Sequence, residues 1–221
     1  MSTRIPPLLE PYLSLPPEAS LIVLTSILGA STNWLVIRYL HTLLNHRSNP
    51  DFESDDGSRP RTVGEDEDDD VSVLLVSFLR DYPFWRDGAG RQGVDLDAAG
   101  RKGKFAFVDG LTGICLPTPP AEKGSPWRAR LDSHGLEDVS RALHGAVDGL
   151  AARGAGKVVL VVDQLDLLLA TAGLEEEEGL GGKLREMVLD LREVCAMPPI
   201  TFPYRAGIVY QHVNRKHMLR S

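Results

Sequence analysis

A short segment near the amino end, residues 25–32 (TSILGAST), occupies the place of a phosphate-binding loop. In such a P-loop, GxxxxGK(S/T), backbone N–H groups wrap the phosphates, the lysine reaches the β- and γ-phosphates and the hydroxyl holds magnesium. Thr32 keeps the hydroxyl, but Ser31 stands at the lysine position and Ala30 at the second glycine position. We therefore interpret Gly29, Ser31 and Thr32 as a degenerate remnant. The simpler alternative is that Ser31 and Thr32 only cap the following helix.

The second chemical candidate is Asp163, which ends the apolar run 157–163 (KVVLVVD). An aspartate at such a strand end can hold magnesium through water, although the pattern is common and also fits an aspartate that caps a turn. The attacking water would need a further carboxylate at a neighbouring strand end. The run 71–78 ends without glutamate, and the nearest acid is Asp81. We predict no ATPase activity, no catalytic residue and no cofactor.

Other reactive side chains are scattered. The six histidines show no HxxxH or HExxH spacing, and no GxSxG elbow is present, so we predict neither a metal site nor a hydrolase triad. Cys115 and Cys195 lie far apart without a CxxC, which indicates reduced thiols in a reducing compartment. The chain is therefore not expected to be an enzyme.

The elements that must position these residues alternate between strand and helix. The sequence predicts strands at residues 21–26, 71–78, 105–109 and 157–162, and helices at 33–44, 79–93 (after Pro83), 136–153 and 183–195. Because the strands are apolar throughout, the pattern predicts an α/β fold with a mostly parallel sheet covered by helices on both faces. Residues 112–126, with four prolines, predict a loop.

The net charge of −7 comes from one segment. Residues 51–70 hold ten acids and two arginines and contribute −8, so the other 201 residues carry +1. Like charges repel and bury little surface, which predicts a solvated loop; a docking tail for a basic partner is the alternative. The low isoelectric point therefore excludes no nucleic-acid role. Arg101, Lys102 and Lys104 are candidate phosphate contacts, against the simpler interpretation of a solvated basic surface.

No segment has the composition of a membrane span. The best candidate, residues 21–37, is interrupted by polar residues and glycine, and the first 20 residues lack the pattern of a secretory signal. We expect a soluble cytoplasmic protein, and a nuclear location is also compatible with the sequence.

Three stretches together resemble the fungal form of the Elongator complex protein 6 family. They are LIVLTSILGASTNWLVIRYL (21–40), VSVLLVSFLRDYPFWRDGAGRQGVDLDAAGRKGKFAFVDGLTG (71–113) and KVVLVVDQLDLLLA (157–170). The resemblance covers roughly residues 18–195, and its most specific parts are the GASTNW loop and the SFLRD–W–FVDGLTG stretch.

The resemblance implies a RecA-like ATPase fold that has lost its P-loop signature, in line with the degenerate loop. It implies a heterohexameric ring with Elongator subunits four and five, which docks on the catalytic Elongator subassembly and binds tRNA. The whole complex modifies the wobble uridine of tRNA, with the chemistry in its third subunit. The loop with Ser31 and Thr32 would then lie near a neighbouring subunit. The alternatives are an ATPase-deficient RecA-like recombination mediator acting on DNA, and an active NTPase with an unusual loop.

The resemblance and the composition together divide the chain into three parts. We expect a Pro-rich surface arm at residues 1–17, a RecA-like domain at 18–198 with the acidic insert at 47–70, and an atypical tail at 199–221. After Cys195 we find no pattern of strand and helix that would finish the sheet. We therefore expect a sheet that is incomplete at its C-terminus, and a truncated or unspliced gene model is one explanation.

Overall fold

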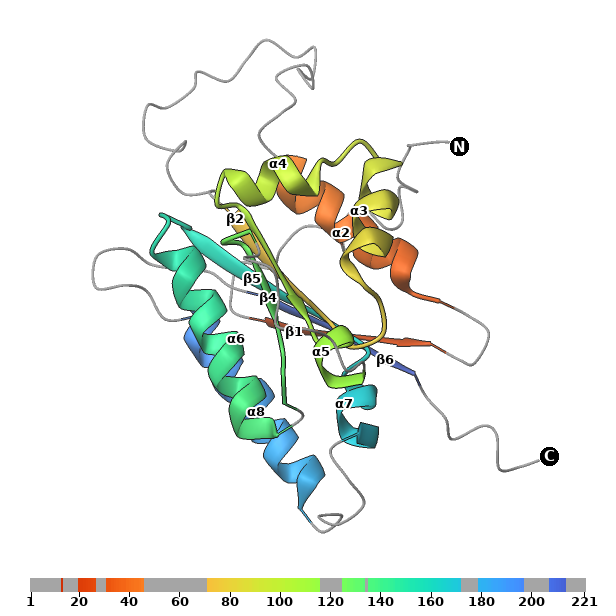
Figure 1. Cartoon of the computed structure of the whole chain (residues 1–221), viewed down its shortest axis with the longest axis vertical. Coiled ribbons are helices and arrows are strands. Elements are labelled where there is room, and N and C mark those ends of the chain that lie inside the picture. Colours follow the sequence, from red (N-terminus) through yellow and green to blue (C-terminus); the bar gives the residue numbers. More distant parts are fainter. Residues whose placement is uncertain are drawn as a thin grey trace, which may run out of the picture.

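The computed structural model describes residues 13, 20–26, 31–45, 71–115, 125–133, 135–171, 179–196 and 207–213. Gly29, the acidic insert 47–70 and the arm 1–17, apart from Leu13, lie outside the described residues. The described part has three layers, in which a sheet lies between two layers of helices (Figure 1).

The sheet has the strand order β1-β6-β5-β2-β3-β4 within the described residues, and every pair in it is parallel. Its strands are β1 (Ser20–Ser26), β2 (Val71–Ser77), β3 (Phe105–Asp109), β4 (Arg128–Arg130), β5 (Lys157–Asp163) and β6 (Gly207–Val213). The expected parallel α/β fold is confirmed. Because the strands are parallel, their carboxyl ends share one edge of the sheet, which is where α/β proteins bind ligands.

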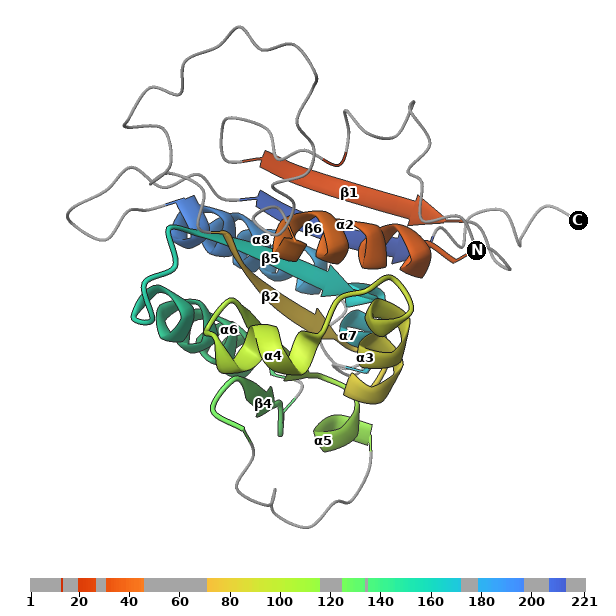
Figure 2. The same cartoon turned by 90° about the horizontal axis from the view of Figure 1, so that it is seen from above.

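The helices cover both faces of the sheet, as Figure 2 shows from above. One face carries α2 (Asn33–Asn45), α3 (Tyr82–Gly90) and α4 (Leu96–Arg101), and the other carries α6 (Leu136–Ala151), α7 (Leu165–Thr171) and α8 (Leu180–Ala196). The short α5 (Thr112–Cys115) follows the carboxyl end of β3. The predicted helices at 33–44, 136–153 and 183–195 are confirmed as α2, α6 and α8.

The central strands divide their side chains between two hydrophobic cores. In β2, Leu74 and Val76 pack beneath α6 and α8, whereas Val73 and Leu75 pack beneath α2, α3 and α4. Side chains alternate along a strand, so a strand covered on both faces must be apolar at nearly every position. The two cores hold β2 and β5 rigidly and therefore fix the residues at their carboxyl ends.

The expectation of a sheet that is incomplete at the C-terminus is wrong. Residues 207–213, which we expected in an atypical tail, form β6 and pair with β1 on one side and β5 on the other. The prediction failed because GIVYQHV follows a segment rich in prolines and mixes polar and apolar residues, unlike the continuous apolar runs of β2 and β5.

Sequence reasoning also missed α4, α5, α7 and β4. These elements are short: α4 has six residues, α5 four, α7 seven and β4 three. Such lengths are too short to show a clear hydrophobic periodicity in the sequence. Leu13 is another correction. It lies within the expected surface arm, yet it is 1% exposed and belongs to the core with Val36 and Tyr39.

Candidate functional site

Thr32 lies with Ser31 in the part of the loop remnant that the structure describes. Its carbonyl accepts the N–H groups of Leu35 (2.9 Å) and Val36 (3.1 Å), so Thr32 caps α2 through its backbone. Its hydroxyl oxygen Oγ1 is buried without a hydrogen-bond partner. Ser31 Oγ instead accepts the N–H of Asn33 at 3.2 Å. Thr32 therefore stands at the start of α2 without a side-chain cap, and the interpretation that Ser31 and Thr32 only cap the helix stays a prediction.

Asp163 lies at the carboxyl end of β5 and is fully buried. Its carboxylate Oδ2 accepts a hydrogen bond from Ser77 Oγ at 2.8 Å, and Ser77 Oγ in turn accepts the N–H of Arg80 at 2.9 Å. The other carboxylate oxygen, Oδ1, is buried and has no hydrogen-bond partner. Ser77 ends β2 directly opposite Asp163 in the register. Sequence reasoning did not connect the two, although Ser77 is a polar residue at the end of an otherwise apolar strand.

The environment of Asp163 disfavours its charged form. Burial raises the pKa of Asp163 to about 6, while the Ser77 hydrogen bond and the positive charge of Arg80 act in the opposite direction. A carboxyl group with this pKa exchanges protons near neutral pH, but it is enclosed on all sides. The arrangement can hold a proton and join two strand ends, while it offers no open face to a substrate.

The backbone after Asp163 is strained. Gln164 has a φ of 57°, which a residue with a side chain rarely adopts, and it is buried. Its carbonyl accepts the N–H of Leu167 at 3.0 Å, so the turn leads directly into α7. Strand, strained turn and helix therefore fix Asp163 tightly.

The other acids near the strand ends have structural partners. Asp81, the candidate for the hydrolytic carboxylate, accepts the N–H of Phe84 at 3.1 Å and caps α3. Asp109, at the end of β3, accepts the N–H of Thr112 at 2.8 Å and its hydroxyl at 2.7 Å. Each carboxylate accepts hydrogen bonds from the start of the helix that follows it. Neither is therefore in a position to act as a general base toward a water molecule.

The structure does not bring the loop remnant and Asp163 onto adjacent strands. Thr32 follows β1, whereas Asp163 ends β5, and β6 lies between these two strands. The residues also do not fit a nucleotide with its magnesium. Ser31 stands where the lysine would be, and Asp163 is buried against Ser77 with a raised pKa.

The basic candidates lie at the opposite end of the sheet. Arg101 and Lys102 are exposed at the end of α4, and Lys104 directly precedes β3. The peptide N–H of Val73 donates to the Lys104 carbonyl at 2.9 Å, which ties this turn to the amino end of β2. The loop remnant and the basic candidates therefore lie at opposite ends of the sheet.

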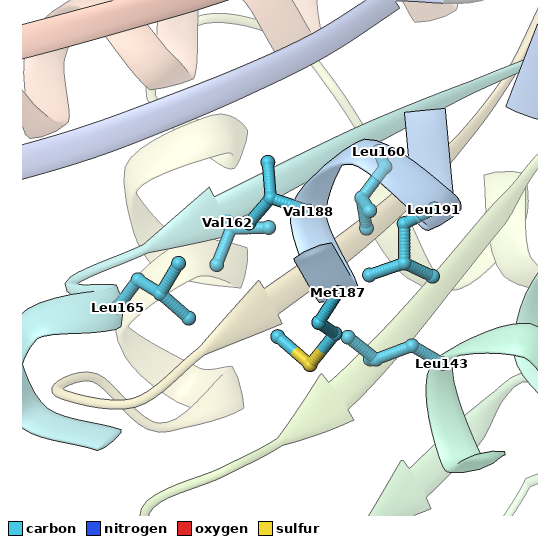
Figure 3. A pocket seen from close by; sticks show the side chains of 7 residues that line it. All are labelled: Leu143, Leu160, Val162, Leu165, Met187, Val188 and Leu191. Atoms are coloured by element: carbon cyan, nitrogen blue, oxygen red, sulfur yellow. The ribbon is translucent and has the colours of Figure 1, made fainter. Parts of the chain in front are cut away.

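A cavity beneath β5 offers no room for a ligand. It has a volume of about 10 Å³, and Figure 3 shows apolar side chains from α6, β5, α7 and α8 pointing into it. The lining residues are Leu143, Leu160, Val162, Leu165, Met187, Val188 and Leu191. Because a single water needs polar partners, this space is a packing gap of the core.

A wider groove of about 310 Å³ runs between α6 and the strands β3 and β4. Its α6 wall consists of small residues, among them Ala142, Gly145, Ala146 and Gly149, and Arg153 lies at its margin. Nothing in this lining could perform acid–base or nucleophilic chemistry.

Metal and thiol chemistry find little support among the described residues. This part of the chain contains no group of three or more His, Cys, Asp and Glu side chains that could hold a metal ion. Cys195 is buried, and burial raises the pKa of its thiol to about 12, so it is unreactive near neutral pH. No described helix is long and apolar enough to cross a membrane.

The comparisons with known proteins identify the fold. No protein family and no curated protein matches the sequence. Among solved structures, the chain is similar to a KaiC-like protein from the hyperthermophilic archaeon Pyrococcus horikoshii, with a TM-score of 0.53 and 16% sequence identity. The similarity covers 90% of this chain and 65% of that protein's length. At this identity it concerns the fold alone, and the chain has a KaiC/RecA-like α/β fold.

Proposed function

We propose that this chain is a non-catalytic, RecA-like ring subunit of the Elongator complex that supports modification of the tRNA wobble uridine. Its partners would be Elongator subunits four and five, here called the sister subunits, in a heterohexameric ring. That ring would dock on the catalytic Elongator subassembly and bind tRNA. The chemistry itself would belong to the catalytic subassembly.

One observation carries the non-catalytic part of the proposal. A KaiC/RecA-like sheet here has Ser31 at the lysine position of its loop and a strand-end Asp163 that is buried against Ser77. The lysine supplies the charge that reaches the β- and γ-phosphates, and a hydroxyl cannot replace it. The assignment to Elongator, rather than to a recombination mediator, is supported by the SFLRD–W–FVDGLTG stretch.

Trp34 supports a subunit interface beside the loop. It stands in the first turn of α2, two residues after Thr32, and is 57% exposed. Exposed tryptophans are enriched in protein–protein interfaces, because they bury a large area at a small entropic cost. A neighbouring ring subunit that covers this surface would account for its exposure in the single chain.

Co-expression with the sister subunits, followed by mass measurement of the purified complex, tests the assembly. We expect a particle with two copies of each of the three chains. A chain that purifies alone, in the presence of both sister subunits, would overturn the proposal. Loss of DNA-damage tolerance without loss of the wobble modification, in cells that lack the chain, would favour the recombination mediator instead.

Substitution of Trp34 separates the interface from the fold. We expect Trp34→Ala to weaken the ring about tenfold or more while the melting temperature of the isolated chain stays within about 2 °C. Leu189→Ala, which removes an exposed side chain from α8, is the matched control and should leave assembly unchanged. Equal effects of both substitutions would count against an interface at the loop.

Nucleotide titration of the isolated chain tests the loss of catalysis. We expect no saturable ATP binding at micromolar concentrations, with or without magnesium. Micromolar binding that disappears in Thr32→Ala would show an active loop and overturn the non-catalytic assignment.

A further inference from the structure

The turns that follow α4 and α6 carry positive residues and lie against each other at the amino end of the sheet. Arg101 and Lys102 end α4, and the following Gly103 has a φ of 76°, which turns the chain toward β3. A Cβ atom at Gly103 would lie 3.3 Å from both Cβ and Cδ of Arg153, so this turn lies against the residue that follows α6. Figure 1 shows the last turns of α4 and α6 at the same end of the molecule, with α5 and α7 at the other.

Arg153 is held in place without being neutralised. One of its terminal nitrogens, Nη2, donates a hydrogen bond to the carbonyl of Pro126 at 2.7 Å. Arg153 is nevertheless exposed to solvent. A guanidinium has five N–H donors, so most of them stay available to a ligand. Because its stem is already fixed, Arg153 would lose less conformational entropy on binding than a free surface arginine.

No carboxylate of the described residues forms an ion pair with Arg101, Lys102 or Arg153. Other exposed arginines are paired, for example Arg86 with Asp87 at 3.0 Å and Arg141 with Asp138 at 2.7 Å. The contact between the Gly103 turn and Arg153 brings three cations without an ion pair to neighbouring turns, which favours the binding of an anionic ligand there. Lys104 adds a further positive charge within the same turn.

We propose that Arg101, Lys102 and Arg153 form one binding surface for the phosphate backbone of RNA, here called the amino-end surface. The identity of the RNA as tRNA rests on the proposed function. The amino-end surface lies at the end of the sheet opposite Asp163 and the loop remnant. It therefore does not reuse the ancestral nucleotide site.

The chemistry of the amino-end surface favours phosphate over a protein partner. The large apolar side chains that the described residues expose are Leu21, Val23, Trp34, Phe84 and Leu189, and none of them belongs to this surface. The centres of protein interfaces are depleted of charge and rich in aromatic groups, whereas RNA backbones are contacted by Arg and Lys. Such contacts position an RNA without reading its sequence.

The test uses the complete ring with the sister subunits and an unmodified tRNA transcript. Its affinity is measured at several salt concentrations for the wild type, for Arg153→Ala and for the double variant Arg101→Ala/Lys102→Ala. We expect Arg153→Ala to weaken binding about 5- to 10-fold at low salt and to reduce the slope of log K against log salt by about 0.7–0.9. The double variant should reduce the slope by about twice as much.

Two further variants separate phosphate binding from structural damage. Arg141→Ala removes the same charge from the first half of α6, where Arg141 is paired with Asp138, and should leave affinity within about twofold. Arg153→Lys keeps the positive charge but loses the planar guanidinium with its several N–H donors. It should retain the wild-type salt slope and lose less affinity than Arg153→Ala.

The outcomes are distinguishable. An unchanged affinity and salt slope in the triple variant Arg101→Ala/Lys102→Ala/Arg153→Ala, within a ring of full mass, would overturn the amino-end surface alone. A triple variant that no longer enters the ring would also overturn it, because the surface would then bind protein. If the wild-type chain never assembles, the proposed function fails, and the same titration on the isolated chain decides the amino-end surface by itself.

Discussion

At the scale of single residues, Asp163 joins two strand ends of the framework. Its carboxylate is fully buried, and Oδ2 accepts a hydrogen bond from the Ser77 hydroxyl. The bond joins the carboxyl ends of β5 and β2. The unpartnered Oδ1 and the strained Gln164 show that this junction also costs free energy.

The pKa of Asp163 predicts how stability depends on pH. Its native pKa is about 6, above the ordinary 3.8, so the native state binds more protons than the unfolded state between these values. The contribution of Asp163 is therefore most favourable below about pH 4 and falls by about 2–3 kcal/mol as the pH rises to 6. Asp163→Asn should remove this fall, which urea unfolding between pH 4 and 7.5 measures as a difference from the wild type.

The exposed Asp148 supplies the control for this measurement. Asp148→Asn shows what the loss of one exposed carboxylate does to the profile. If Asp163→Asn and the wild type have parallel profiles, the buried carboxyl does not titrate between pH 4 and 6, and the account of its environment is wrong.

Sequence reasoning placed Asp163 correctly at a strand end but could not describe its surroundings. Its polar partner, Ser77, lies 86 positions away in the chain and becomes a neighbour only through the pairing of β2 with β5. Thr32 shows the same limit. Its type suggested a side-chain cap, yet its carbonyl caps α2 while its hydroxyl stays unpartnered.

At the scale of elements, α4 depends on a close approach at Gly100. A Cβ atom there would lie 2.3 Å from Cδ2 of Trp127, so the helix rests directly on the indole ring. Gly100→Ala should lower the free energy of unfolding by about 2 kcal/mol, because the clash outweighs the better helix propensity of alanine. Chemical denaturation of the isolated chain measures the change.

Gly145 in α6 is the matched control, because no atom lies within 4 Å of a Cβ placed there. Gly145→Ala should raise the free energy of unfolding by about 0.5–1 kcal/mol. Destabilisation at both positions would indicate that contact with Trp127 is not the cause of the effect at Gly100.

The long, strongly patterned elements followed from sequence, whereas β6 did not. In β2 and β5 burial on both faces demands an apolar residue at nearly every position, and such a run is visible without a structure. The place of β6 in the sheet depends on its pairing with β1 and β5, which cannot be predicted from the composition of β6 itself. Long-range pairing, more than local preference, decides such a strand.

The central position of β6 predicts a strong effect of proline. Val209 pairs with Ile22 of β1 and with Val161 of β5. Proline lacks the N–H and is excluded from central strands, so Val209→Pro should destabilise the chain by about 3 kcal/mol or more. Val209→Thr, which keeps the β-branched shape, should cost less than half of that. A mild effect of proline in thermal unfolding would argue that β6 is not part of the folded sheet.

At the scale of the whole molecule, the two proposals concern opposite ends of one sheet. The carboxyl end holds the loop remnant, Asp163 and the exposed Trp34, and we assign it to the framework and to a neighbouring subunit. The amino end holds Arg101, Lys102 and Arg153. A parallel sheet makes this division possible, because all strands begin at one edge and end at the other.

The uneven charge of the chain gives the last prediction. The segment 51–70 carries −8 and joins the fold at Val71, whose register partner is Lys157 at the amino end of β5. Because the segment is bonded to Val71, at the amino end of β2, we expect its negative charge to oppose RNA binding at the amino-end surface. Replacing its ten acids with Asn and Gln changes the net charge from −7 to +3. We expect the association rate of the ring with tRNA to rise about 3- to 10-fold at 50 mM salt.

The rise should vanish near 1 M salt, where the Debye length is only about 3 Å, and a gain that persists there would not be electrostatic. Neutralising the four acids of residues 175–178 is the control, and it should have a smaller effect. If the neutralised segment instead releases the chain from the ring, it is a docking tail for a basic partner, and electrostatic opposition to RNA is the wrong account of its charge.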